Sequence, residues 1–269
     1  MRLFLILLFF PLTGLTQTLQ SHCIALAENT PGIRFIDFAA FGEGLTPEDV
    51  RLSYIGHSTY LIETPSGLGI ATDYTGFIGG DKLPDVVTMN RAHSSHWTAS
   101  PDPEIPHILR GWGDYGEPAD HRLVLEDDIL IRNVTTDIRG GGGVVEDGNS
   151  IFIFEIAGLC IGHLGHLHHE PSEAQYAAIG RLDVVMAPVD GGMTLPLPDM
   201  IKVLKRAKSS VVLPMHWFGE YTLKQFLVGM EDEFQVEVTG ASSTTVSLRT
   251  LPRQPTIRVL LPRPFAPAD

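Results

Sequence analysis

The sequence predicts an α/β fold in which a series of β-strands is followed by alternating strands and helices. Short apolar runs bounded by turn residues fill the first part of the chain, whereas helical periodicity appears only in the second part. The 27 glycines and 19 prolines also favour a loop-rich α/β protein over a helical bundle. With 269 residues, 43% of them hydrophobic, the chain can bury a sizeable core.

Strands account for most of the first part. A hairpin is expected from the β-rich runs Val50–Ile55 and Thr59–Glu63, which flank a glycine turn. A second hairpin is expected over Ser150–Cys160, turning at residues 157–158. Further strands are expected at 68–72, at 85–89 and, as a pair, within 123–134, and a long loop is expected at 98–122.

Helices are expected after residue 170. Ser172 and Gln175 have the spacing of a capping box before a helix that ends near Gly180. An amphipathic pattern predicts a second helix at 198–208, and a third is expected at 222–230. Strands are expected between and after them, at 182–187, 210–213, 236–248 and 256–261. No linker divides this pattern, so a single domain is expected over residues 28–269.

The N-terminus has the pattern of an export signal. Arg2 precedes the apolar run Leu3–Phe10, and the run from Ala25 to Ala27 has the small-x-small form of a cleavage site. Residues 1–27 are therefore predicted to be a signal peptide. The apolar run is too short to span a bilayer, which argues against a retained anchor. These features predict a periplasmic or secreted protein without stable membrane insertion after cleavage.

The two cysteines are divided by this predicted cleavage. Cys23 would be removed with the signal peptide, and Cys160 would remain as the lone cysteine of the mature chain. A buried inert thiol is then expected at Cys160, and no internal disulfide is expected.

The charge balance limits the partners. The formal net charge is −13, and no run of lysine and arginine is present. A nucleic-acid-binding surface needs clustered basic residues, so nucleic acid is not expected as a partner.

Histidines follow three separated strands. His93 and His96 come after the strand expected at 85–89, His163 ends the second hairpin, and His216 follows the strand expected at 210–213. A lone histidine at a strand end is more often a hydrogen-bonded loop residue than a ligand. Because imidazole is the commonest zinc ligand, and because the pattern recurs three times, we predict that these four histidines surround one metal ion, either all as ligands or with one of them supporting the others.

Two aspartates extend this pattern. Asp73 and Asp190 end two more strands, so either can orient a histidine or hold a metal-bound water. A metal would lower the pKa of that water towards ~7 and give a hydroxide nucleophile at neutral pH.

Seven segments form a recognisable pattern in order along the chain: Tyr54–Glu63, Ile70–Asp73, Val86–His96, Asn149–Glu155, Gly162–His166, Asp183–Thr194 and Leu213–His216. In order and spacing they resemble the metallo-β-lactamase superfamily, and the nearest likeness is to small hydrolases related to ascorbate-phosphate lactonases. The resemblance covers roughly residues 50–217 and implies an αββα sandwich, two mixed β-sheets flanked by helices, with a metal site at one edge. It implies ligand positions for His93, His96 and His216, a supporting position for Asp73, and a proton donor or supporting group at His166.

The chain also departs from that family. The family loop His-x-His-x-Asp-His has Arg91 in place of the first histidine and Ser95 in place of the aspartate, and His163 stands where a metal-bridging aspartate is usual. With fewer carboxylates, a single metal ion is expected, zinc first, with iron or another transition metal as the alternative. An inward-pointing Arg91 would bind an anionic substrate, whereas an outward one would form a surface salt bridge.

The expected function is therefore that of an exported metal-dependent hydrolase acting on a small-molecule ester, lactone or phosphoester. The replacements at Arg91 and Ser95 leave an alternative, a degenerate member that binds ligand or metal without hydrolysis. Redox chemistry at a histidine-bound iron or copper is a third possibility. The sequence does not indicate the oligomeric state.

Overall fold

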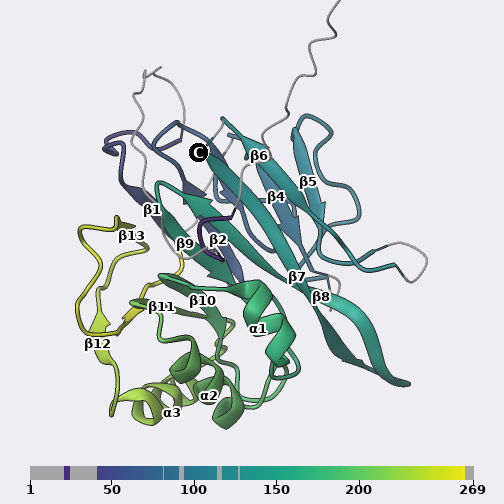
Figure 1. Ribbon diagram of the computed structural model, residues 1–269, viewed down its shortest axis with the longest axis vertical. Coiled ribbons are helices and arrows are strands. Elements are labelled where there is room, and N and C mark those ends of the chain that lie inside the picture. Colours follow the sequence, from purple (N-terminus) through teal and green to yellow (C-terminus); the bar gives the residue numbers. More distant parts are fainter. Residues whose placement is uncertain are drawn as a thin grey trace, which may run out of the picture.

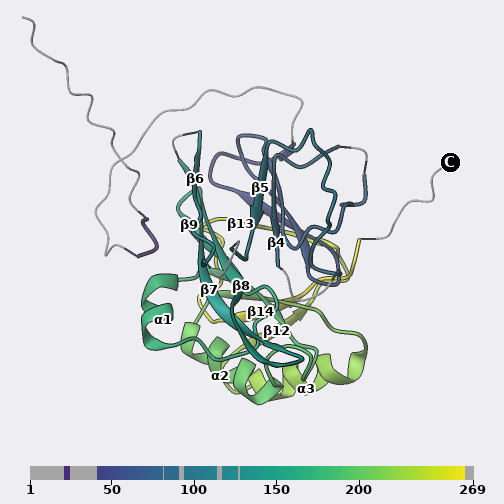
Figure 2. The same cartoon turned by 90° about the vertical axis from the view of Figure 1, so that its right-hand side faces the viewer.

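The computed structural model describes residues 21–24, 41–80, 82–90, 94–113, 117–126 and 128–263. Within these residues two mixed β-sheets stack on each other, and three helices cover the outer face of the second sheet (Figure 1, Figure 2). The α/β fold with two mixed sheets is thereby confirmed. None of the helices in these residues is long and apolar enough to cross a membrane.

The first sheet has the strand order β13-β1-β2-β3-β4-β5. The hairpin of β1 and β2 and the strands β3 and β4 lie where the sequence predicts them, and β3, β4 and β5 run parallel. Strand β5 falls inside the predicted long loop. Its four residues lack apolar alternation, and only Leu109 is buried, so its pairing with β4 makes it a strand. The bounds are β1 Val50–Gly56, β2 Thr59–Glu63, β3 Gly69–Ala71, β4 Val86–Met89, β5 His107–Arg110 and β13 Ser243–Val246.

The second sheet has the order β12-β14-β11-β10-β9-β8-β7-β6. Strands β12, β14, β11, β10 and β9 are parallel to their neighbours, and β9, β8, β7 and β6 are antiparallel. Strands β7 and β8 are longer than predicted, because their pairing continues into the glycine run at Gly140 and Gly143. The bounds are β6 Arg122–Leu125, β7 Ile129–Gly140, β8 Gly143–Ile156, β9 Leu159–His163, β10 Val184–Pro188, β11 Val211–Met215, β12 Gln235–Val238 and β14 Thr256–Val259.

The helices are α1 (Glu173–Ile179), α2 (Leu197–Ala207) and α3 (Glu220–Met230). The predicted capping box at Ser172 and Gln175 is present, and Gly180 is the C-cap of α1. The helices form one layer on the second sheet (Figure 2). On the outer face of the first sheet, the described part of the chain has loops in place of the expected helical layer, and side chains such as Tyr74, Ile78 and Ile105 pack there.

The principal core lies between the two sheets. Its largest members are Tyr54 and Tyr60 from the first sheet and Phe152 and Phe154 from the second, all at most 1% exposed. A second core fills the space between the second sheet and the helices. Both cores hold the strands rigidly, so the loops at the strand ends start from fixed positions.

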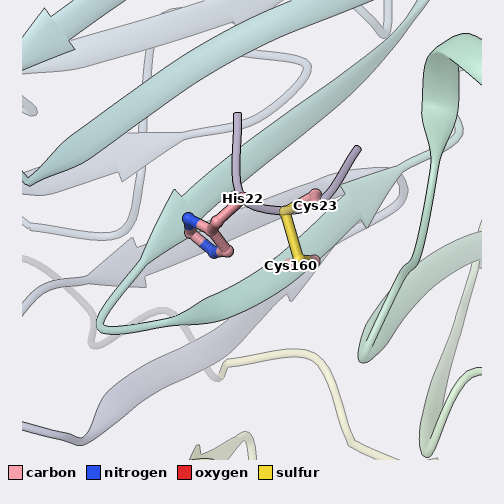
Figure 3. A group of neighbouring side chains, drawn as sticks. All are labelled: His22, Cys23 and Cys160. Carbon is pink, nitrogen blue, oxygen red and sulfur yellow. A yellow bond between two sulfur atoms is a disulfide. The ribbon is translucent and has the colours of Figure 1, made fainter. Parts of the chain in front are cut away.

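Cys23 and Cys160 form a disulfide (Figure 3). The expectation that Cys160 is a lone buried thiol is therefore wrong. It followed from the predicted cleavage after Ala27, which removes Cys23. A chain that begins at Glu28 cannot contain this bond, so the predicted cleavage and the disulfide exclude each other.

Candidate metal centre

Five of the site residues meet at one edge of the two sheets. His57 lies in the turn between β1 and β2, and Asp73 and His96 follow β3 and β4 of the first sheet. Asp190 and His216 follow the parallel strands β10 and β11 of the second sheet. Because the carboxyl ends of parallel strands share one edge, residues far apart in the chain come together there.

Asp73 holds His96. The Nδ1 atom of His96 lies 2.5 Å from Asp73 Oδ2 and 3.0 Å from Ser58 Oγ. The other carboxylate oxygen, Asp73 Oδ1, accepts a hydrogen bond from Asn90 Nδ2 at 2.8 Å. Both the aspartate and the histidine are fully buried. With a carboxylate accepting at Nδ1, the neutral ring of His96 keeps its lone pair on Nε2.

Asp190 holds His216 in the same way. The Nδ1 atom of His216 donates to Asp190 Oδ2 at 2.9 Å. Asp190 is itself fixed by Thr194, whose hydroxyl donates to Oδ2 at 2.6 Å, and by three backbone N–H groups of the following loop. The neutral ring of His216 therefore also keeps its lone pair on Nε2.

These two lone pairs face each other. The Nε2 atoms of His96 and His216 are 3.1 Å apart. His57 completes a group in which one ligand atom from each residue lies within 4.8 Å of the others. Two nitrogens held 2.0–2.1 Å from a tetrahedral zinc ion lie about 3.3 Å apart, close to the observed separation. The donor set thus fits a zinc ion, and the two carboxylates are the usual partners of zinc-bound histidines.

His57 was not predicted as a site residue. The sequence places it between Gly56 and Ser58, a position that we interpreted only as a hairpin turn. Its ring lies 4.2 Å from that of His216 and 5.1 Å from that of His96, measured between centroids. Its signal was weak, because it follows a strand of the antiparallel hairpin and has no second histidine beside it.

The backbone of the centre is unusual. His57, Asp73 and His216 have φ values of 52°, 43° and 55°, in the left-handed region that residues other than glycine rarely adopt. Such strain persists where the surrounding structure imposes it, and it gathers at functional sites. Three strained residues in one cluster indicate that the fold is arranged to place these side chains.

His163 does not join the group, contrary to the prediction. Its Nε2 atom donates to the carbonyl of Ser58 at 2.8 Å, and its Nδ1 atom accepts from the N–H of Gly165 at 3.1 Å. Both ring nitrogens are therefore used by the backbone. Because β9 ends at His163, the side chain points into the packed space between the sheets and connects β9 to the β1–β2 turn.

His166 lies against the centre, and its ring is 4.6 Å from that of His96 and 5.1 Å from that of His216. Its Nδ1 atom is 2.6 Å from Nε2 of His168, which is also buried. The Nδ1 atom of His168 accepts from the backbone N–H of Arg139 at 2.6 Å. A backbone N–H can only donate, so His168 carries its proton on Nε2 and donates to His166, whose own proton must then lie on Nε2.

Burial sets the charge states of the deepest groups. It raises the pKa of Asp73 above its usual value, against the effect of the neighbouring histidines and of hydrogen bonds from Asn90 and Ser58. It lowers the pKa of His163, which is consistent with a neutral ring that accepts at Nδ1. For Asp190, burial alone would raise the pKa. The hydrogen bonds from His216, Thr194 and the backbone outweigh this effect and hold the pKa of Asp190 well below the usual value.

An exposed apolar side chain borders the centre. Phe218 is 63% exposed, yet its ring lies 5.1 Å from the ring of His216 and 5.4 Å from that of His57. His93, predicted as a metal ligand, lies outside the described residues, and so does Arg91, for which both an anion-binding role and a surface salt bridge were considered.

A histidine centre supported by carboxylates, at the edge of two stacked sheets, defines the metallo-β-lactamase class of folds. The family model described as β-lactamase superfamily domain matches residues 51–216, more than half of the chain. The protein therefore belongs to this family.

Solved structures share the fold. A protein from Thermotoga maritima, assigned as a zinc-dependent hydrolase of the metallo-β-lactamase superfamily, is 24% identical with a TM-score of 0.54, covering 78% of this chain and 98% of its own. Igni18, a metallo hydrolase from Ignicoccus hospitalis, is 18% identical with a TM-score of 0.53, covering 74% of this chain and 99% of its own. No curated protein matches the chain.

Proposed function

We propose that the protein is a metal-dependent hydrolase whose metal, zinc in the first instance, is held by His57, His96 and His216. The observation that carries this proposal is the pair of Nε2 atoms of His96 and His216, 3.1 Å apart. Both are acceptors in the neutral rings, because Asp73 and Asp190 take up the Nδ1 positions. Two facing acceptors repel each other unless a positive charge lies between them, and three imidazoles at this spacing suit a metal ion.

The metal, when bound, supplies a water molecule of lowered pKa and polarises a substrate oxygen. The chain's own residues prepare that chemistry. Asp73 and Asp190 fix the tautomers of two ligands and raise their basicity. Burial of the centre strengthens each electrostatic contact with the substrate, since the surrounding medium is less polar than water.

His166 has a different role in this proposal. Its Nε2 atom carries a proton, because the chain of donors from Arg139 through His168 ends at His166 Nδ1. An N–H group has no lone pair for a metal, but it donates a hydrogen bond. We infer that His166 donates to the oxygen of the substrate on which negative charge develops, or to the leaving group. Arg139 and His168 are positioning residues for this donor.

The substrate class proposed is a small ester, lactone or phosphoester. The exposed Phe218 beside His57 and His216 would contact an apolar part of such a substrate. Export to the periplasm or the medium is proposed as well. It is supported by the N-terminal signal pattern and by the disulfide, a bond that persists in oxidising compartments.

The test combines metal content with activity. We expect close to one zinc per chain by elemental analysis, and its loss in a His96→Ala, His216→Ala double variant. The zinc-loaded protein is then assayed on panels of esters, lactones and phosphodiesters. Zinc binding without hydrolysis of any panel would favour the non-catalytic alternative. No zinc uptake would contradict the proposal, and preferential uptake of iron or copper would favour redox chemistry.

A further inference from the structure

The segment Ser21–Ile24, here called the N-terminal strap, is docked on the β8–β9 hairpin. Cys23 is 5% exposed, belongs to the core between the second sheet and the helices, and is joined to Cys160 of β9 by the disulfide. Figure 3 shows the strap crossing the hairpin, with the His22 ring beside the sulfur–sulfur bond. The strap is thus a covalent part of the fold and not a tail beside it.

A buried carboxylate receives the strap. Glu155 is 1% exposed, and it accepts hydrogen bonds from the Ser21 hydroxyl and, at 2.9 Å, from the His22 backbone N–H. The same side chain forms an ion pair with Arg132 at 2.9 Å, and His22 Nδ1 lies 3.1 Å from it. Without the strap, Glu155 Oε2 would lose the partners that the strap provides, and an unsatisfied buried carboxylate is costly.

The end of α1 also fits the strap. The carbonyl of Cys23 accepts from the N–H of Arg181 at 3.1 Å. At Gly180, an added Cβ would lie 2.6 Å from that same carbonyl oxygen, and its φ is +73°. A glycine is required there by the approach of the strap as well as by the backbone conformation. Three independent features, the disulfide, the carboxylate and the glycine, accommodate residues 21–23.

His22, Cys23 and Cys160 also have the spacing of a small metal site. The bond between the sulfurs removes both thiolates, however, and His22 is turned to Glu155. The group is therefore a structural link in the oxidised protein.

We propose that the mature protein keeps the N-terminal strap. The leader is then cleaved at a bond before Ser21, and not after Ala27. Between the apolar run and Ser21 the sequence offers small residues at Gly14, Thr16 and Thr18. The strap then closes a covalent loop between residues 137 positions apart. It fastens the start of β9, the strand whose other end carries His163 and leads to His166.

The first experiment determines the first residue of the exported protein. The full chain is produced with its own leader in a host with an oxidising periplasm, and intact mass and N-terminal sequencing are measured with and without reductant. We expect a first residue no later than Ser21, with thiol-alkylating reagent incorporated only after reduction. A chain that begins at Glu28 and has one free thiol would overturn the proposal.

A variant at a position outside the described residues sharpens this test. Ala27→Trp places a bulky residue where a small one is needed for cleavage after residue 27. We expect the variant to be processed at the same position as the unmodified chain. Loss of processing in Ala27→Trp would show that cleavage uses that position, and the proposal would fail.

The contribution of the bond is measured on the purified exported protein. A bond that closes so long a loop should raise Tm by about 5–10 °C for a domain of this size. We expect Cys23→Ser, Cys160→Ser and the double variant to lose the same amount, since each lacks the same bond. Unchanged Tm in all three would show that the strap is not part of the folded protein.

Discussion

The backbone N–H of His216 donates to the carbonyl of His57 at 2.7 Å, so two proposed ligands from opposite sheets are joined directly. The hydroxyl of Tyr54 donates to the same carbonyl at 2.8 Å. Both histidines have positive φ, and each holds the other in that conformation. The position of one ligand therefore depends on the other, and packing of the two sheets fixes the geometry of the centre before any metal enters.

Removal of His57 tests the ligand that the sequence did not predict. We expect His57→Ala to lower zinc affinity by at least ~100-fold, because a site that loses one of three imidazoles loses a full metal–nitrogen bond. His121→Ala is the matched control, since the described contacts of the His121 ring are with the Arg110 carbonyl and the Phe152 ring, and not with His57, His96 or His216. Competition with a chelator of known affinity measures both. Equal affinities in the two variants would remove His57 from the ligand set.

The role of Asp190 is tested by a change of one atom. In Asp190→Asn the amide group retains the shape but no longer offers a carboxylate to His216 Nδ1, so the ligand loses its orientation and basicity. We expect zinc affinity to fall ~10–100-fold. Asp199→Asn, at an exposed position in the first turn of α2, should leave affinity unchanged. The same chelator competition measures the zinc affinities of the two variants. Similar affinities would contradict the proposal that Asp190 supports His216 as a ligand.

The sequence predicted the strands that end at the centre because their apolar runs are local signals. Asp73, Asp190, His96 and His216 could be selected for the same reason, since each follows such a run. The distinction between His163 and His57 could not be made in this way. It depends on which ring meets the backbone. The ring of His163 donates to the Ser58 carbonyl of the other sheet and accepts from the N–H of Gly165 in its own following loop, and the contact with Ser58 is settled only by sheet packing.

The disulfide was missed for a related reason. A leader pattern near Ala27 is a local signal, whereas the site that receives Cys23 is built from Glu155, Cys160 and Gly180, which lie more than a hundred residues further along. Strand β5 illustrates the same limit on the prediction of the fold, because it is a strand only through its pairing with β4.

Acid should destabilise the metal-free protein through His163. Burial lowers the pKa of this ring in the folded state, so the unfolded chain binds a proton more readily. The stability contributed by neutral His163 is present above its unfolded pKa of about 6.5 and is lost as the pH falls below it, by up to ~1.4 kcal/mol per pH unit. In urea unfolding between pH 7.5 and 5, His163→Gln should show a shallower decline. Parallel curves would contradict this assignment.

Two glycines near the centre should respond differently to alanine. Gly165 has φ of +59°, and an added Cβ would lie 2.4 Å from side-chain atoms of both Asn90 and Asn149. We expect Gly165→Ala to reduce the free energy of unfolding by about 2 kcal/mol or more. At Gly192 an added Cβ meets nothing within 4 Å, so Gly192→Ala should change the free energy of unfolding by less than about 0.5 kcal/mol. Denaturant unfolding compares them, and equal losses would contradict the packing at Gly165.

The donor chain at His166 makes the most specific prediction. His168→Gln keeps its polarity, because the amide oxygen can accept from the Arg139 N–H while the amide nitrogen donates to His166 Nδ1. His168→Leu removes both functions at similar volume. If His166 acts as an N–H donor, His168→Leu should lower kcat by ~10-fold or more with little change in KM or zinc content, and His168→Gln should restore most of it. Nitrogen-15 NMR of the histidine rings gives an independent check, with the proton of His166 on Nε2 in the unmodified protein and in His168→Gln. Loss of zinc in His166→Ala would contradict this role and identify His166 as a ligand. The two roles exclude each other, because a neutral ring that binds metal through Nε2 carries its proton on Nδ1, whereas the donor chain requires the proton on Nε2.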